Sequence, residues 1–260
     1  MKRSRTLIGA VWPALILATL LIAVWEVAVQ FSGVRPQILP APSRVLEQGI
    51  AHRDDLVLHA SATLGVTLVG FAVSLLVSWA IAIAVDFVPG LRRALTPFLV
   101  ASQTLPIIAI APLMIIWFGF GALPKILVIL LVTFFPVALG LIEGFRSASP
   151  SATALLRSMG ASRWQIFYRL RLPQALPRFF TALRIGITYA VVGAIFAEYV
   201  GAKSGLGIYM SVQKNSFRTD LVLAAVVVTA LMSVTLFLLT YLVQRIVAPW
   251  TLSSPKESHS

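Results

Sequence analysis

Long apolar runs alternate with short polar segments along most of this chain. Six of the runs are long and apolar enough to cross the hydrocarbon core of a bilayer, which takes about 20 residues of helix. We predict transmembrane helices near 8–30, 61–86, 96–118, 123–144, 178–200 and 221–247. The first run follows a basic start, as in a signal peptide, but it is too long for a signal core and no A-x-A site follows it. We therefore expect it to remain as the first transmembrane helix.

The composition supports a membrane protein. The chain has 260 residues, of which 58% are hydrophobic and only 12% charged, whereas about a quarter of the residues of a soluble domain are charged. We predict an all-α membrane protein with one transmembrane domain over 1–252 and a disordered polar tail at 253–260. The net charge of +12 sits in short clusters between the apolar runs, without the continuous basic stripe of a nucleic-acid-binding face. Lipid is therefore an expected partner, and nucleic acid is not.

The distribution of lysine and arginine predicts the orientation, because short cytoplasmic loops are enriched in these residues. With the N-terminus inside, the four inner segments carry 13 of the 21 lysines and arginines, and the three outer segments carry 7. The outer segments also hold four acidic residues, Glu47, Asp54, Asp55 and Asp220. We therefore predict that both termini are cytoplasmic.

The outer segment between the first two predicted helices contains a short surface helix. The string Ile38-Leu39-Pro40-Ala41-Pro42 predicts an extended entry, and Ser43 is the expected N-cap because its hydroxyl can accept from a free amide of the first turn. Val45, Leu46 and Ile50 would form the apolar face of this helix.

The inner segment 145–177 is predicted to hold two short helices rather than a passive linker. Ser149 followed by Pro150 is a helix start, since the hydroxyl caps the helix and proline at the first position loses no hydrogen bond. The first helix is expected over 151–159, and Gly160 should interrupt it.

The second helix of this loop is predicted over 163–171. Ser162 with Gln165 three residues later forms a capping-box pattern. Trp164 and Phe167 lie on one side at helical spacing, and Pro173 is expected to end the helix. The physical pattern alone leaves two interpretations open: a docking surface for a soluble partner, or an interfacial pair lying on the inner leaflet.

A resemblance favours docking. Gly160, nine residues, then Leu170-Arg171-Leu172-Pro173 resembles the EAA motif (E-A-A-x3-G-x9-I-x-L-P) of binding-protein-dependent ABC permeases. In that family the loop forms coupling helices that insert into a cytoplasmic ATPase. The resemblance implies the following ATPase-coupling residues in this chain: Ala154, Leu155, Leu156, Gly160, Ala161, Trp164, Phe167, Leu170, Leu172 and Pro173. The motif's glutamate is replaced by Ala154.

The family resemblance implies an architecture and a set of partners. The expected assembly is a homodimer of this chain in the bacterial inner membrane, with two cytoplasmic ATPase subunits and a periplasmic substrate-binding protein. ATP and Mg would be bound by the ATPase. This chain lacks the G-x-x-x-x-G-K-[ST] phosphate loop and any Ser-His-acid set, so we predict that it has no catalytic residues, no cofactor and no metal of its own.

Other strings resemble one branch of these importers, the branch for nitrate, sulfonates, taurine and thiamine precursors. The matching strings are 39–42, 115–119, 134–136, 197–198 and 204–207. The stretch 190–202 is most similar to permeases for the hydroxymethylpyrimidine precursor of thiamine. Riboflavin-type and sulfonate or taurine importers are the alternatives. An ion-coupled carrier is an alternative from another class, but it would need acidic residues at mid-membrane, and the sequence has almost none.

Helix-breaking, aromatic and acidic residues within the predicted helices suggest a translocation path. Proline frees backbone carbonyls in a membrane helix, and an ionisable group there usually faces a cavity or a partner. The candidates are Pro106, Pro112, Trp117, Phe135, Pro136, Tyr189 and Glu198. The aromatic residues would equally suit an interfacial belt, and Glu198 could instead pair with Lys203.

Two further charges have expected structural roles. Asp86, at the inner end of the second helix, is expected to pair with Arg92 or Arg93. Arg184, about two turns into the fifth helix, is expected to extend to the inner surface.

Overall fold

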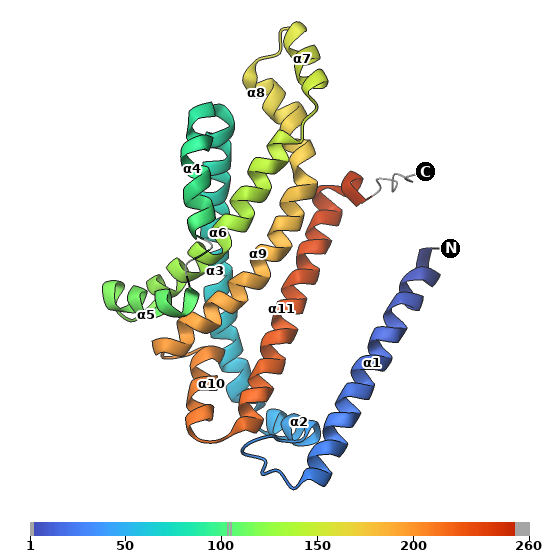
Figure 1. Cartoon of the computed structure of the whole chain (residues 1–260), viewed down its shortest axis with the longest axis vertical. Coiled ribbons are helices and arrows are strands. Elements are labelled where there is room, and N and C mark those ends of the chain that lie inside the picture. The colour runs from blue at the N-terminus through green and yellow to red at the C-terminus, as the bar shows by residue number, and fades with distance from the viewer. Residues whose placement is uncertain (1–2, 103, 105, 253–260) are drawn as a thin grey trace.

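The computed structural model describes residues 3–102, 104 and 106–252, and all its regular elements in these ranges are helical (Figure 1). The α-helices are α1 (Arg3–Ser32), α2 (Pro42–Ala51), α3 (Arg53–Phe87), α4 (Pro89–Ser102), α5 (Ile107–Phe118), α6 (Ala122–Arg146), α7 (Pro150–Ser158), α8 (Arg163–Ile166), α9 (Leu172–Gly201), α10 (Leu206–Asn215) and α11 (Thr219–Val247). A π-helical turn, η1 (Phe167–Arg171), joins α8 to α9, and a 3-10 turn, η2 (Pro249–Leu252), follows α11. The predicted disordered tail, 253–260, lies outside the described residues.

Five of the six predicted membrane helices are confirmed as long apolar helices. The five that are long and apolar enough to cross a bilayer are Trp12–Ser32, Arg53–Phe87, Ala122–Arg146, Arg163–Gly201 and Thr219–Val247. The start of α1 and the end of α11 lie toward the same end of the molecule, away from α2 and α10 (Figure 1).

The third predicted span, 96–118, is wrong as a single helix. Its N-terminal part belongs to α4, which returns along α3, and its C-terminal part is α5, which lies across the end of α6 (Figure 1). Pro106 lies at the break with an extended backbone (φ −71, ψ 115). It has no N–H for a helical bond and disfavours a helical residue before it. At 12 residues, α5 is about 18 Å long, too short to span by itself.

The centre of the fold is the packing of α3, α6 and α9. Glycine brings α6 and α9 close together: a side chain at Gly140 would collide with Ala182, and one at Gly144 would come within 2.9 Å of the Cβ of Ala175. Small residues at such spacing are typical of helix contacts in membranes, where close backbone approach supplies much of the attraction. This contact fixes the direction in which both helices leave the membrane.

We expect Gly144→Ala to destabilise the protein, because the added methyl meets the backbone of Ala175 as well as its side chain. Overpacking of this kind costs about 1–3 kcal/mol. Gly65→Ala is the matched control, since Gly65 is also helical but has nothing within 4 Å of the added carbon. Thermal unfolding in detergent should show a lower Tm for Gly144→Ala and an unchanged Tm for Gly65→Ala. Equal Tm values would mean that α6 and α9 do not pack this closely.

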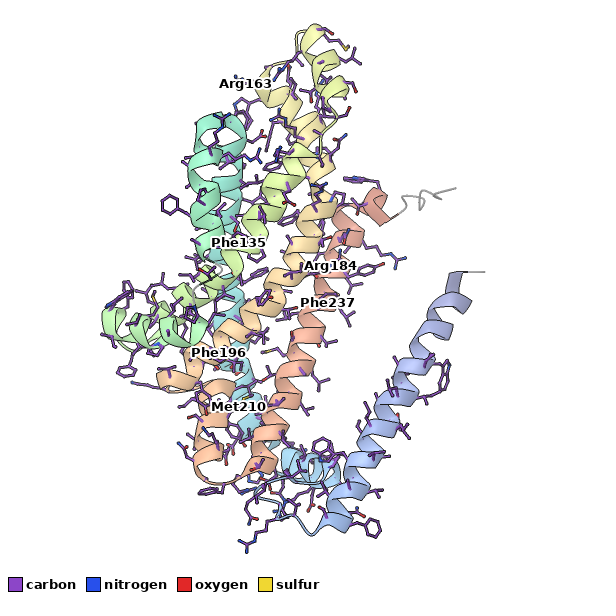
Figure 2. All side chains as sticks on the ribbon, viewed as in Figure 1. Phe135, Arg163, Arg184, Phe196, Met210 and Phe237 are labelled. Carbon is purple, nitrogen blue, oxygen red and sulfur yellow. The ribbon has the colours of Figure 1, made fainter. Side chains whose placement is uncertain are left out.

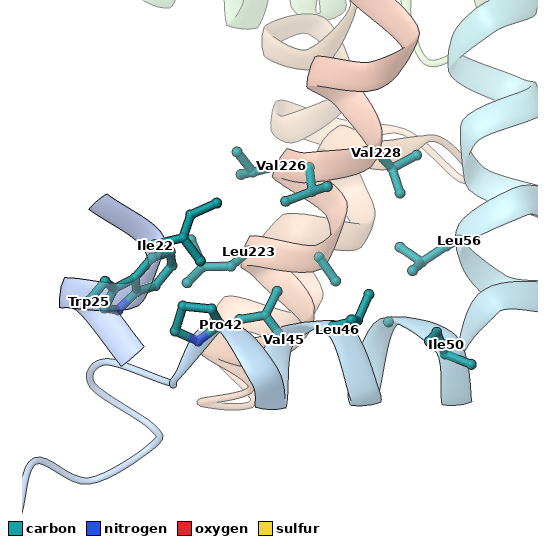
Figure 3. A pocket seen from close by; sticks show the side chains of 13 residues that line it. Ile22, Trp25, Pro42, Val45, Leu46, Ile50, Leu56, Leu223, Val226 and Val228 are labelled. Carbon is teal, nitrogen blue, oxygen red and sulfur yellow. The ribbon is translucent and has the colours of Figure 1, made fainter. Parts of the chain in front are cut away.

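The first helix joins the remainder of the chain near its C-terminal end. Glu26 of α1 accepts from the backbone N–H of Ser43 at 2.9 Å and from its hydroxyl at 2.7 Å. The predicted N-cap at Ser43 is therefore wrong: α2 is preceded by Ala41, and the free amide of Ser43 is satisfied by a carboxylate from another helix. Beside this contact, α1, α2 and α11 line an apolar cavity of 440 Å³, into which Trp25 and Leu46 project (Figure 3).

Candidate coupling surface and polar clusters

The elbow between α7 and α8 forms as the sequence predicts. Ser149 caps α7 by accepting from the N–H of Ala152. Ser162 and Gln165 form a reciprocal capping box, with the Ser162 N–H donating to Gln165 Oε1 at 2.7 Å. Gly160 has φ +82, a conformation that glycine adopts without steric cost. Both caps and the glycine turn are confirmed.

The predicted end of the second helix at Pro173 is wrong. The chain stays helical from Arg163 to Gly201, with the turn η1 between α8 and α9. In this turn Leu172 donates its N–H to the carbonyl of Phe167, five residues back. Proline normally clashes with the carbonyl four residues earlier in an α-helix, and the wider π-turn immediately before Pro173 relieves that clash.

Because the helix is continuous, the elbow lies well beyond the end of α11. The end of α11 is tied to α9 by Arg184, whose Nη2 donates to Gln244 Oε1 at 2.9 Å. The helical segment from Arg163 to Arg184 corresponds to about 30 Å along the axis, and Figure 2 shows Arg163 at the far end from that contact. The elbow lies beside the end of α3, where Phe87 contacts Trp164. Its exposed side chains are available to a soluble partner at this end of the molecule.

The two aromatic residues that were expected to be exposed together differ in burial. Trp164 is 64% exposed, but Phe167 is only 5% exposed and packs against Phe87 and Phe145, with ring centroids 5.5 and 5.0 Å away. Trp164 packs against Phe87, with the two ring centroids 4.6 Å apart. Phe167 is thus buried in this chain and cannot project into a partner from this conformation.

The other coupling candidates fall into two groups. Ala154, Leu155 and Gly160 are exposed, whereas Leu156, Ala161, Leu170, Leu172 and Pro173 are half-buried. Two further residues at this end, which the resemblance does not include among the coupling residues, are also exposed: Met159 at 74% and Tyr168 at 71%.

An ion pair joins the end of α3 to the turn η1. Arg171 Nη1 donates to both carboxylate oxygens of Asp86, at 2.6 and 2.7 Å. The sequence predicted a local partner, Arg92 or Arg93; Arg92 does line a cavity of 200 Å³ together with Asp86. The long-range contact with Arg171 could not be found from spacing, because the two residues are brought together only by the packing of α3 against α9.

At the end of the molecule where α2 and α10 lie, Glu198 holds the start of α10. This side chain is fully buried and accepts from the hydroxyl of Thr63 at 2.8 Å and from the N–H of Gly207 at 3.0 Å. Thr63 Oγ1 also accepts from the N–H of Leu206 at 2.8 Å, and His59 Nδ1 accepts from the N–H of Gly205 at 3.0 Å. Three side chains thus satisfy amides that the start of a helix leaves free.

The glycines of this cluster are needed for contact with the carboxylate. A side chain at Gly205, where φ is +127, would collide with the Glu198 carboxylate, and one at Gly207 would come within 2.7 Å of the Glu198 Cβ. Lys203, the partner expected from the sequence, does not contact Glu198 in the described ranges.

A second polar pair lies between α9 and α11. Arg184 also donates Nε to the Phe180 carbonyl at 3.1 Å, and Gln244, itself buried, donates Nε2 to Thr251 at 2.9 Å. Arg184 was expected to extend to the inner surface; in the structure its guanidinium is held by Gln244 near the end of α11. A glutamine within the last apolar run was the sequence feature that could have indicated this contact.

The translocation-path candidates do not form one cluster in a single copy of the chain. Phe135 and Pro136 line an open groove of 490 Å³ between α6 and α9, with Arg178 and Ile185 on the opposite wall. Tyr189 is 48% exposed one helical turn beyond Ile185.

The remaining candidates lie on other surfaces. Trp117, 63% exposed, is at the end of α5, and Pro106 and Pro112 are at its start and within it. Glu198 is nine residues from Tyr189, so it projects from the opposite side of α9. The groove between α6 and α9 is the part of the predicted path that the fold assembles.

These features define a class: a polytopic, all-helical membrane protein with a helical elbow extending beyond its spans. Residues 74–253 match the family model of the binding-protein-dependent transport system inner membrane component. The chain belongs to this family and is a permease subunit of an ABC importer, an inner-membrane multi-pass protein and not a catalytic enzyme.

Several characterised relatives align over most of the chain. The formylaminopyrimidine transport permease protein ThiX of Halalkalibacterium halodurans is 34% identical, covering 89% of this chain and 92% of the relative. The riboflavin transport system permease protein RibX of Chloroflexus aurantiacus is 34% identical with 96% of both chains covered. The taurine transport system permease protein TauC of Escherichia coli is 33% identical, with 88% and 86% covered. These relatives match the predicted branch.

One solved structure, a crystal structure of an amino acid ABC transporter with histidines, supports the fold. It superposes with a TM-score of 0.63 and 16% identity, covering 76% of this chain and 96% of that one.

Proposed function

We propose that this chain transmits ATP hydrolysis to a solute path through the α7–α8 elbow. The position of the elbow, about 30 Å of helix beyond the contact of Arg184 with Gln244 near the end of α11, is the observation that carries the proposal. A cytoplasmic ATPase dimer, with its ATP and Mg, engages the exposed residues of this elbow. Since the helical segment Arg163–Gly201 runs without a break from the elbow to the cluster at Glu198, movement of the elbow is delivered along this segment.

The path itself lies between two copies of this chain. The groove between α6 and α9 is open on one side, and a second copy facing it would close the groove. A periplasmic binding protein delivers solute at the end where α2 and α10 lie. The assembly then alternates between inward and outward access, with the ATPase biasing the two states.

The solute proposed is a hydroxymethylpyrimidine-type precursor of thiamine. Two of the relatives with 34% identity are named for heterocycles, a formylaminopyrimidine and riboflavin, while taurine is the substrate named for a relative at 33%. Phe135 in the groove and Tyr189 beyond it would give a flat ring aromatic surfaces to pass. Riboflavin and taurine or sulfonates are the alternatives.

Purification and reconstitution test this function. The full chain, solubilised from its native membranes, should retain a soluble ATPase, and the complex in proteoliposomes should hydrolyse ATP faster when loaded binding protein is added. Uptake of labelled hydroxymethylpyrimidine, riboflavin and taurine then identifies the solute. Absence of any ATPase from the purified complex would contradict the coupling proposal, and preferential uptake of taurine would contradict the pyrimidine assignment.

The proposed orientation, with both termini cytoplasmic, predicts that the elbow and the loop after α9 are accessible from opposite sides of the membrane. Ser151 and Ser204 are both exposed, and the chain has no cysteine of its own. A cysteine at Ser151 should react with a membrane-impermeant maleimide only after the cells are opened. A cysteine at Ser204 should react in intact spheroplasts. The reverse labelling pattern would show the opposite orientation.

A further inference from the structure

A small cavity lies between the end of α3 and the α7–α8 elbow. Its volume is 140 Å³, about the space of four or five water molecules at roughly 30 Å³ each. The lining residues are Asp86, Phe87, Arg157, Arg163, Ile166 and Arg171. Three guanidinium groups therefore face a space that is large enough for one acidic side chain.

The charges around this cavity do not balance. Arg171 is engaged by both oxygens of Asp86. Arg157 and Arg163 make no ion pair in the described ranges, and the sequence has no acidic residue between Glu143 and Glu198. A carboxylate for these two arginines cannot come from the elbow itself. An anion bound between them would relieve their mutual repulsion and gain two charge-assisted hydrogen bonds.

The surroundings indicate a protein as the source of the anion. Leu155, Met159 and Trp164 of the same elbow are 61%, 74% and 64% exposed. Apolar side chains around a charged centre are typical of a protein–protein contact, in which the rim excludes water from the central pair. A lipid headgroup could also bind arginine, but the elbow extends about 30 Å of helix beyond the contact of Arg184 with Gln244 near the end of α11.

We propose that this cavity receives an aspartate or glutamate side chain of the cytoplasmic ATPase, held between Arg157 and Arg163. This inference rests on the proposed function and adds the chemistry of the contact: the permease presents the cations and the ATPase the carboxylate. The Asp86–Arg171 pair forms the floor of the cavity and keeps the third guanidinium from competing for the incoming carboxylate.

Charge reversal in the complete complex tests the inference. Arg163→Glu should reduce the ATPase retained on the solubilised full chain by about tenfold or more, since breaking close interfacial charge pairs has effects of this size. Arg157→Glu should act similarly. Arg163→Lys should keep part of the binding, because it keeps the charge but loses the planar guanidinium. Arg245→Glu is the matched control, an exposed arginine at the end of α11, and should change nothing.

A complementary change in the ATPase completes the test. Acidic residues on the ATPase surface are changed singly to arginine, and one of them should restore binding to Arg163→Glu while weakening binding to the unchanged chain. Full ATPase retention by both glutamate variants, or rescue by no reversal, would overturn the inference. If the glutamate variants lose ATPase binding in vesicles that contain anionic lipid but keep it in purely zwitterionic vesicles, the cavity is assigned to lipid instead. If the unchanged chain retains no ATPase, the proposed function itself fails.

Discussion

Trp164→Ala should release the ATPase from the solubilised complex at low and at high salt. Trp164 is 64% exposed at the elbow and is backed by Phe87, so its ring is held in place before any partner binds. Truncating a tryptophan at the centre of an interface costs about 2 kcal/mol or more, which is about a 30-fold loss of affinity. Salt should not rescue or worsen the loss, because the lost contact is apolar.

Arg169→Ala is the matched comparison for this variant. Arg169 is exposed on the same helix and does not line the cavity next to Asp86, so its loss should reduce binding slightly and mainly at low salt. A pull-down quantified at two salt concentrations separates the two variants, and the Tm of each chain alone checks that the elbow still folds. Retention of a full complement of ATPase by Trp164→Ala at both concentrations would show that this surface does not couple.

Glu198→Ala should cause the largest loss of stability at the outer end. The variant leaves the Gly207 N–H and the Thr63 hydroxyl without their buried acceptor. A buried donor left without its partner costs about 1–3 kcal/mol, so both the Tm in detergent and the protection of α10 amides from hydrogen exchange should fall. Glu198→Gln should keep much of the stability, since both bonds are made to the single oxygen Oε2, which the amide oxygen can replace.

Glu47→Ala is the control for Glu198, being an exposed glutamate of α2 on the same side of the membrane. It should leave Tm and amide exchange unchanged. If Glu198→Ala loses transport but keeps its Tm and its α10 protection, the carboxylate acts in the solute path and not as a helix cap. The two measurements therefore decide between the functional and structural roles of this residue.

The segment around Pro173 combines local features that the sequence predicts with a helix continuity that it does not. Local features were predicted well: the Ser149 cap, the Gly160 turn and the Ser162–Gln165 capping box all depend on residues within a few positions of one another. The continuity of the helix through Pro173 was not predicted, because the π-turn that accommodates proline is read from the backbone path and not from composition.

The family and the class of transporter followed from the sequence, because hydropathy, arginine distribution and the motif at Gly160 are properties of the chain itself. Five apolar helices were likewise predictable from length and hydropathy, since a single apolar segment of that length satisfies its own backbone hydrogen bonds in lipid by forming a helix. Tertiary structure alone decided which polar groups meet. Glu198 binds the start of α10, and Arg171 binds Asp86, across separations of 9 and 85 residues. Burial of Phe167 beside the exposed Trp164 was decided in the same way. Such contacts depend on how α3, α6 and α9 pack, and the apolar surfaces of these helices are too uniform for that packing to be predicted from the hydropathy pattern.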